Sequence, residues 1–281
     1  MTRVDQFESV FRSAVKDRYS PKAITLEKVL VVTDLDEVAV TDVVNRSKAF
    51  LGSHGWDLDY QVIEGNAFKT THDLLNLCHK HQPDLICTYR NLQSEGWRYP
   101  HSLGEHLDVL LQKTDKPVLV MPHPRDEIKW PEQIKGVMAV TDHLTNDFHL
   151  IDHALHFAGE QGVLWLAHIE DETYFNRFAN AISKIPSIDT LEATTRIKKQ
   201  LLKEPHDYIA SCRLSLRSHK PGVRVEEIVT FGHRLSQFQE HIQSHNIDLL
   251  VMNTKDVDQQ AMHGLAYPLA IELRQLPLLM L

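Results

Sequence analysis

A histidine-rich stretch comes closest, in residue types and spacing, to a metal site. Residues 149–156 read HLIDHALH. Its four potential ligands stand at positions i, i+3, i+4 and i+7: His149, Asp152, His153 and His156. On a helix this spacing places all four side chains on one face, as Zn²⁺ ligands would need to be. The apolar residues of the stretch occupy the opposite face, so we favour a solvated helix face and keep a metal site as the weaker alternative.

Two short apolar runs, each ending in an acid, offer a different kind of site. VLVVTD spans 29–34 and VMAVTD spans 137–142, so Asp34 and Asp142 each follow a strand-like sequence. A carboxylate in this position either caps the helix that follows or contacts a polar ligand. His143 comes directly after Asp142 and is the histidine that we expect to lie nearest a ligand.

The sequence carries no signature of nucleophilic catalysis. It has no GxSxG motif, and no cysteine is flanked by a plausible base at a sharp strand-to-helix turn. The three cysteines, Cys78, Cys87 and Cys212, are odd in number and lack CxxC spacing, which favours reduced, buried thiols. We therefore predict that the protein is not an enzyme and that it lies in the cytoplasm.

Composition narrows the range of partners. The chain has 281 residues, a formal net charge of −8, 42% hydrophobic residues and 24% charged residues. Its acidic residues are spread over both halves, which argues against a nucleic-acid partner. The first twenty residues are charged throughout, unlike a signal peptide, and the apolar runs have the length of strands, so we expect no membrane association.

The two acid-closed runs open an internal repeat. In each copy an amphipathic helical pattern and a glycine follow the acid. Further along, HQPDLICTY from His81 matches HNIDLLVMN from His245, and DKPVLVM at 115–121 matches QLPLLML at 275–281. Between the acid-closed run and the segment that starts at His81 in the first copy and at His245 in the second, the second copy is longer by about 56 residues.

The additional segment contains one further strand and one further helical region. VLWLAHIED at 163–171 reads as a strand, and residues 190–219 as a long helix interrupted near Pro205. The first copy is therefore predicted to omit the second strand and second helix of the unit. Apolar strands that alternate with helices are typical of a parallel sheet covered on both faces, which binds ligands at the carboxyl ends of its strands.

Domain boundaries follow from this pattern. Residues 1–26 form a leader with Phe7, Val10, Phe11 and Val15 on one face of a predicted helix, which we expect to dock on the domain. The truncated first domain spans 27–122 and the complete second domain 134–281. A proline-punctuated linker joins them.

The chain resembles the universal stress protein family in its tandem-domain form. The resemblance rests on the order of elements, the acid that closes the first strand, the DLLVMN strand with a loop to Gly264, and the terminal PLLML strand. The resemblance covers residues 28–281. It implies an α/β fold with two Rossmann-like domains, related to the adenine nucleotide alpha hydrolases. It also implies that the two units pair through their last strands, as the family's homodimers do. A homodimer of the whole chain is a further option.

In ATP-binding members of that family, the loop after the fourth strand reads GxxG, nine residues, then glycine followed by Ser or Thr. Glycines let the backbone wrap phosphates, and the last pair presents amides at a helix start. In the second copy Asn253 and Asp256 replace the first two glycines, and Leu265 follows Gly264. The resemblance therefore implies a degenerate loop around Asp142, His143 and these residues.

The first copy departs further from the motif. Tyr89 takes the first glycine position, and Gly104 is followed by Glu105, whose carboxylate would repel phosphate. Asp34 is the family residue it retains, and the resemblance places that residue opposite a ribose.

Three hypotheses follow. The leading one is a non-catalytic stress-response regulatory protein that binds an unidentified small molecule or protein and needs no cofactor. The alternative is an ATP-binding, slowly ATP-hydrolysing universal stress protein that uses the second domain. The weaker third is a metal-binding protein that uses His149, His153 and His156.

Overall fold

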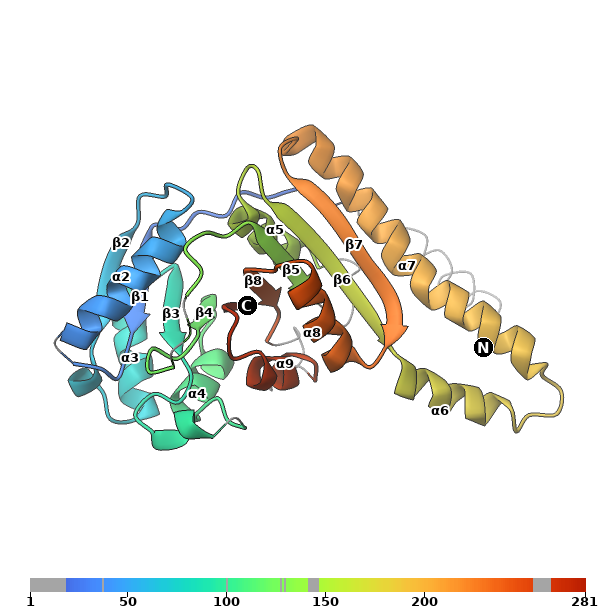
Figure 1. Cartoon of the computed structure of the whole chain (residues 1–281), viewed down its shortest axis with the longest axis horizontal. Coiled ribbons are helices and arrows are strands. Elements are labelled where there is room, and N and C mark those ends of the chain that lie inside the picture. Colours follow the sequence, from blue (N-terminus) through green and yellow to red (C-terminus); the bar gives the residue numbers. More distant parts are fainter. Residues whose placement is uncertain are drawn as a thin grey trace.

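One nine-stranded sheet runs through both halves of the chain in the computed structural model (Figure 1). The structure describes residues 19–36, 38–99, 101–126, 128, 130–140, 147–254 and 264–281. The predicted leader helix lies outside the described residues. Every residue of the strands β3, β5 and β8, whose bounds follow, is buried, so both faces of the sheet are covered there, as their continuous apolar sequences predict.

The first half of the sheet is built from residues within 27–122. Its elements are β1 (Lys28–Val32), α2 (Val38–Gly52), β2 (Asp59–Ile63), η1 (Gly65–Ala67), α3 (Thr71–His81), β3 (Leu85–Tyr89), η2 (Glu95–Arg98), α4 (Glu105–Lys113) and β4 (Val118–Met121). A capping box fixes the start of α3, since the Thr70 side chain accepts from the amide of Asp73 and the Asp73 side chain accepts from the amide of Thr70.

The second half is built from residues within 134–281. Its elements are β5 (Gly136–Val140), α5 (Phe148–Ala158), β6 (Val163–Asp171), α6 (Glu172–Ile182), α7 (Thr190–His219), β7 (Arg224–Gly232), α8 (Arg234–Ser244), β8 (Leu249–Met252), α9 (Ala266–Glu272) and β9 (Leu278–Met280). In Figure 1, α6 and the first part of α7 extend away from the rest of the molecule.

The two halves pair through their last strands. The strand order is β2-β1-β3-β4-β9-β8-β5-β6-β7, and all neighbours are parallel except β4 and β9. These two run antiparallel, with Val118 opposite Met280 and Val120 opposite Leu278. The predicted pairing of the two units within one chain is confirmed.

Equivalent positions of the two halves share their local geometry. The Asp84 carboxylate accepts from the amides of Glu27 and Lys28 at the start of β1, at 3.0 Å each. In the second half the Asp248 carboxylate accepts in the same way from Lys135 and Gly136, at 2.8 and 2.9 Å. Each acid thus ties the start of the first strand of its unit to the strand that it precedes.

The first half has one strand fewer than the second, as predicted. Its β2 matches β7 in the sequence repeat, but in the sheet it lies beside β1, the place that β6 takes beside β5. The unfilled position is therefore the outermost one, where β7 lies in the second half. A single helix, α2, connects β1 to β2 and sets β2 directly beside β1, just as α5 connects β5 to β6 and sets β6 beside β5.

The predicted interruption of the long helix is wrong. α7 runs without a break through Pro205, which is buried within its 30 residues. A proline removes one backbone hydrogen bond and strains the helix locally. Apolar residues that follow Pro205 toward the sheet, among them Ile209 and Leu216, are buried, and this packing compensates for the lost bond.

A buried arginine ties the end of β3 to the second half. Arg90 is 4% exposed, and its Nε and Nη2 atoms donate to the carbonyl oxygens of Ala270 and Leu273, at 2.9 and 3.0 Å. Both carbonyls belong to the C-terminal end of α9, where the helix dipole favours a cation. Burial lowers the pKa of Arg90 to about 10, which still leaves the guanidinium charged at neutral pH.

Aromatic stacking forms a second contact between the halves. Trp56 lies between His54 and His156, with ring centroids 4.6 and 4.4 Å away. His156 belongs to α5, so a helix of the second half packs here on the segment between α2 and β2. None of the helices among the described residues is long and apolar enough to span a membrane.

Candidate functional site

The candidate site of the first half lies where β1 and β3 end, around Asp34. The side chain of Asp34 is 5% exposed. The Tyr89 hydroxyl donates to its carboxylate and accepts from the Asp34 amide at 3.0 Å. The same hydroxyl lies 2.6 Å from the hydroxyl of Thr33. The acid that the resemblance places opposite a ribose is thus bound to the chain's own tyrosine.

Two further residues complete the enclosure of Asp34. The backbone amide of Gln93 donates to its second carboxylate oxygen at 3.1 Å, and Arg125 Nη1 lies 3.9 Å from the same oxygen. The Gln93 side chain donates to the carbonyl oxygens of Gly65 and Phe68, at 2.6 and 3.2 Å, which closes the space between these loops. The sequence motif pointed to Tyr89 but gave no indication of Gln93 or Arg125, because they approach Asp34 only in the folded chain.

His123 packs against the same tyrosine. Its ring lies edge-on to Tyr89 with centroids 4.9 Å apart. Burial lowers the pKa of His123 to about 4, so the ring is neutral at physiological pH. Burial, followed by the nearby Asp34 carboxylate, raises the pKa of Tyr89, so its hydroxyl keeps the proton that it donates. At the centre of this site the Asp34 carboxylate accepts from two neutral donors, the Tyr89 hydroxyl and the Gln93 amide, with the Arg125 guanidinium 3.9 Å away.

The loop that precedes α4 retains the glycine of the family motif, but its surroundings do not favour phosphate binding. Gly104 has a φ of 86°, and a Cβ there would lie 2.6 Å from the Cα of Asn91, so only glycine fits. Glu105 is the exposed first residue of α4, and Asp108 also lies in its first turn. Two carboxyl groups therefore occupy the helix end at which a phosphate would bind.

Replacing Tyr89 by phenylalanine should lower the free energy of unfolding by about 1–3 kcal/mol, because the Asp34 carboxylate loses one of its donors while the Asp34 amide and the Thr33 hydroxyl lose a partner. Urea denaturation followed by circular dichroism measures the change. Tyr99→Phe is the matched control, since Tyr99 is 68% exposed. Equal midpoints for the two variants would show that the Tyr89 hydroxyl contributes nothing.

The predicted site of the second half is described only in part, because Asp142, His143 and Asp256 lie outside the described residues. Asn253 follows β8, and its amide donates to the carboxylate of Asp147, which caps the start of α5. The Thr254 amide donates to the Leu281 carbonyl at 2.8 Å. The structure thus brings the end of β8 to the start of α5, which places Asn253 at the strand edge predicted for it.

The loop end of the second half differs from that of the first. A Cβ at Gly264 would meet no atom within 4 Å, and Leu265 immediately precedes α9 without a side-chain cap. The first turn of α9 carries no acid, in contrast to the first turn of α4. The repulsive carboxyl groups of the first half therefore have no counterpart at this described end of the loop.

A histidine and a glutamate near this edge were not predicted from the sequence. His168 is 4% exposed, and its Nε2 lies 2.8 Å from the Glu170 carboxylate, two residues further along β6. Ala167 pairs with Val140, the last described residue of β5, so His168 lies just beyond the paired ends of these strands. Polar residues two positions apart at the end of an apolar strand share one face of a sheet, and that signal could have identified them.

The histidine stretch proves to be a packed helix face, so the expectation of a solvated face is wrong. His153 and Asp152 are 4% exposed, and His156 stacks on Trp56 at 4.4 Å. His153 Nδ1 lies 2.9 Å from the backbone carbonyl of His149. Among the described residues, no three His, Cys, Asp or Glu side chains are grouped as a metal ion would require. Most of this face is covered, because His156 packs on Trp56 of the first half and the Asp152 carboxylate accepts from the Tyr19 hydroxyl and the Lys22 amide, whereas His149 is exposed.

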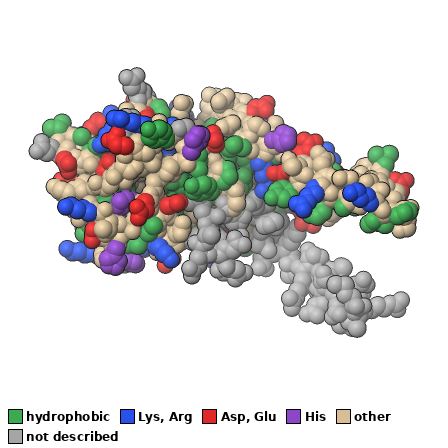
Figure 2. All heavy atoms as spheres, turned by 90° about the horizontal axis from the view of Figure 1, so that it is seen from below, with side chains coloured by type: hydrophobic (Ala, Val, Ile, Leu, Met, Phe, Trp, Pro, Cys, Tyr) green, Lys and Arg blue, Asp and Glu red, His purple; other side chains and the backbone are tan. Residues whose placement is uncertain are grey.

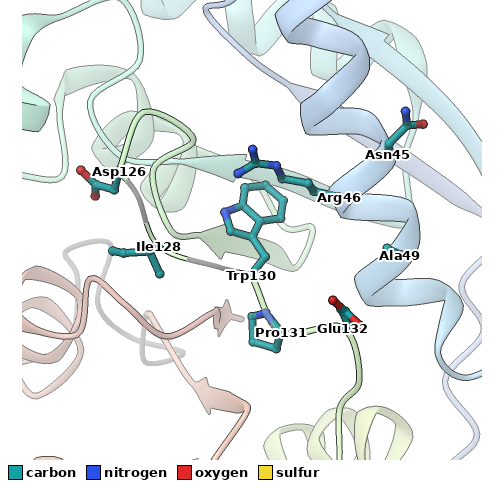
Figure 3. Close-up of a pocket in the computed structure, with 8 residues that line it drawn as sticks. All are labelled: Asn45, Arg46, Ala49, Asp126, Ile128, Trp130, Pro131 and Glu132. Atoms are coloured by element: carbon teal, nitrogen blue, oxygen red, sulfur yellow. The ribbon is translucent and has the colours of Figure 1, made fainter.

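A pocket of about 560 Å³ lies between α2 and the linker, as Figure 3 shows. Its lining residues are Asn45, Arg46, Ala49, Asp126, Ile128, Trp130, Pro131 and Glu132. The Arg46 guanidinium lies 5.8 Å from the Trp130 ring centroid and pairs with Asp42 at 2.6 Å. Asp126 pairs with Arg274 at 3.8 Å. The pocket offers an apolar wall beside charges that already have partners, and none of its residues was predicted as a site from the sequence.

Comparisons with known proteins identify the fold. No family model matches the sequence, and no curated protein matches it. A protein of unknown function from Pseudomonas aeruginosa PAO1 is similar in structure, with a TM-score of 0.53, 13% identity and 92% of each chain covered. A putative universal stress protein from another strain of Pseudomonas aeruginosa has a TM-score of 0.51 and 14% identity, over 92% of this chain and 93% of that one.

A universal stress protein from Archaeoglobus fulgidus is similar in the same way. Its TM-score is 0.50 at 10% identity, over 92% of this chain and 98% of that one. At such low identity these likenesses show the fold alone. The chain has the fold of universal stress proteins, an α/β architecture with a mostly parallel sheet, in agreement with the resemblance seen in the sequence.

Proposed function

We propose that this protein is a non-catalytic stress-response regulator that acts by binding a small ligand or a protein partner and does not depend on ATP. The observation that carries the proposal is the occupied site of the first half, where Tyr89 and Gln93 already engage Asp34. A nucleotide entering there would have to displace buried hydrogen bonds and approach the carboxylate of Glu105.

The first half then serves as a scaffold for the second. Its strands continue the common sheet through β4, which pairs with β9. The Arg90 side chain, at the end of β3, donates to backbone carbonyls at the C-terminal end of α9. The second half has the larger unit and an unobstructed Gly264, so it is the half in which we expect ligand binding. The fold of universal stress proteins supports the association with stress responses.

Titration with MgATP tests the proposal against its alternative. We expect no saturable binding of MgATP at or below its physiological, millimolar concentration, and no phosphate release above a buffer blank. Differential scanning fluorimetry should show the same, because a ligand that binds only the folded state raises the melting temperature. Tighter binding that is lost in Asp142→Ala and kept in Asp34→Ala would establish an ATP-binding second domain and overturn the proposal.

The alternative rests on a specific observation. At the start of α9 the described residues include no acid in the first turn, so a phosphate would meet less repulsion from this turn than from the first turn of α4. The Asp142→Ala and Asp34→Ala pair in the same titration assigns any binding to one half. Native mass spectrometry of the protein purified without added ligand then identifies the molecule that it carries.

A further inference from the structure

The pocket between α2 and the linker combines an apolar wall with a hollow of ligand size. Its volume of about 560 Å³ is typical of small-molecule sites. The apolar part of its lining is formed by Ala49, Ile128, Trp130 and Pro131. A ligand that packs on these side chains removes apolar surface from water, and this burial favours binding.

Apolar side chains also reach the surface on the helical hairpin of α6 and α7, but in a different setting. Figure 2 shows hydrophobic side chains among charged ones along this projecting arm, at the right of the view. Tyr174, Phe178 and Leu191 of the hairpin are 62%, 67% and 78% exposed, whereas Trp130 in the pocket is 6% exposed. The pocket holds its apolar residues in a hollow between a helix and the linker (Figure 3), which is the setting in which small molecules bind.

The indole nitrogen of Trp130 gives the pocket a hydrogen-bond donor in need of an acceptor. Its Nε1 atom is buried and has no hydrogen-bond partner among the described residues. In Figure 3 this nitrogen is turned toward Asp126 and Ile128, which line the same pocket. Buried N–H groups in proteins are almost always hydrogen-bonded, and leaving one without an acceptor costs free energy. The pocket therefore favours a molecule that brings an acceptor oxygen to this nitrogen.

The Arg46 guanidinium provides a cation at one side of the pocket. It lies 5.8 Å from the centroid of the Trp130 ring and pairs with Asp42 at 2.6 Å. The side chain of Asp42 is 53% exposed and lies one turn away on α2, so this ion pair contributes little to stability. A guanidinium group has five N–H donors. Arg46 can therefore bind the carboxylate of a ligand in addition to Asp42 or instead of it.

Glu132 provides the opposite charge. It is exposed, and in Figure 3 it lies beside Pro131, apart from the Arg46 guanidinium. Asp126, also in the lining, pairs with Arg274 at 3.8 Å, which balances its charge. A ligand with only a negative charge would be repelled by Glu132, and one with only a positive charge would be repelled by Arg46. A ligand that carries both charges matches the pocket best.

We propose that this pocket binds a small zwitterion with an apolar body, such as an apolar amino acid. The carboxylate of the ligand accepts from Trp130 Nε1 and from Arg46. Its ammonium group contacts Glu132, and its apolar side chain packs on Ile128 and Ala49. This site shares no residue with the strand edge of the second half, so it is a separate ligand site of the protein.

An NMR titration that follows the indole N–H signals of the full chain tests the proposal. The chain has four tryptophans, and Trp130→Phe identifies the signal of Trp130 by its loss. L-phenylalanine or L-leucine should shift the Trp130 signal saturably, with a Kd on the order of 0.1–1 mM, as expected for so small a ligand. The signals of Trp56 and Trp165, which do not line the pocket, should stay in place.

Two analogues of L-phenylalanine test the charge pattern. 3-Phenylpropionate lacks the ammonium group and 2-phenylethylamine lacks the carboxylate, so each should bind at least about tenfold more weakly. If either analogue binds as tightly as L-phenylalanine, the pocket does not recognise a zwitterion. If neither amino acid shifts the Trp130 signal saturably at concentrations up to about ten times the expected Kd, the pocket does not bind this class of ligand. Both results overturn the proposal.

Variants of α2 locate the ligand. Arg46→Gln should weaken binding of L-phenylalanine by about tenfold, because the ligand carboxylate loses its cation. Lys48→Gln removes the same charge two residues further along α2 and should leave the Kd unchanged. Lys48 is a matched control because its Nζ lies 5.2 Å from the Tyr60 ring centroid and it does not line the pocket. Equal Kd values for these two variants would contradict the assigned role of Arg46.

Filling the hollow gives a second, independent test. Ala49 is an exposed residue of α2, so Ala49→Phe should leave the fold intact, which circular dichroism checks. The larger side chain occupies space that the ligand needs and should abolish the shift of the Trp130 signal. Full binding of L-phenylalanine by a folded Ala49→Phe variant would place the ligand elsewhere and overturn the proposal.

Discussion

Replacing Arg90 by methionine is expected to lower the free energy of unfolding by about 2–4 kcal/mol. The substitution leaves the carbonyls of Ala270 and Leu273 buried without their donor and removes the cation from the C-terminal end of α9. The loss is limited because burial of the guanidinium is itself costly, as its lowered pKa shows. Urea denaturation, followed by tryptophan fluorescence and circular dichroism, measures it.

The shape of that transition carries additional information. Because Arg90 links the two halves, its loss should also separate the unfolding of one half from that of the other, so that the two probes no longer coincide. Arg98→Met is the control, since Arg98 is exposed and pairs with Glu95 on the surface, and it should change stability by less than about 0.5 kcal/mol. A loss below about 1 kcal/mol for Arg90→Met would mean that the link contributes little.

Stability should fall steeply between about pH 6.5 and pH 4. Burial lowers the pKa of five histidines in the folded chain, His54, His123, His153, His156 and His241, with His123 and His156 reaching about 4. In the unfolded chain these groups titrate near pH 6.5. Below that pH the unfolded state binds more protons, so the stabilisation present at neutral pH is lost as the pH falls toward the folded-state values.

The expected loss is on the order of 3 kcal/mol from pH 7 to pH 4.5, after allowance for the partial exposure of His156. Urea midpoints at a series of pH values measure it. His156→Phe keeps an aromatic ring beside Trp56 and should flatten the profile, whereas His79→Gln, at an exposed position, should not. An unchanged slope in His156→Phe would assign the acid sensitivity to other groups.

Much of the fold could be predicted from the repeat. The repeat matched 115–121 with 275–281 as the last strands of the two units, and the family resemblance implied that these strands pair, as β4 and β9 do. The long helix was predicted at 190–219, where α7 lies. The position of β2 could not be predicted, because sequence correspondence records connection order and not which neighbour a strand joins. The helix interruption predicted at Pro205 was wrong for a related reason. The sequence shows the local cost of a proline in a helix, but it does not show the tertiary packing that offsets this cost.

Only the part of the candidate site that lies within one sequence motif could be predicted. Tyr89 at a glycine position predicted a blocked loop in the first half. The contact of Gln93 with Asp34 joins residues 59 positions apart, and the packing of His156 on Trp56 joins the two halves. Periodicity gives the relative orientation of side chains along one helix, but it does not reveal which face another element will cover. The buried polar face of α5 was for that reason predicted as solvated.

The antiparallel contact of β4 with β9 has a consequence for how the protein behaves at low abundance. If the two units were separate chains joined through these strands, the pair would dissociate on dilution. Pairs of two identical units would also form in competition with the mixed pair. Here both strands belong to one chain, so the pairing is independent of protein concentration. Each folded chain therefore always contains one unit of each kind, even when few copies are present in the cell.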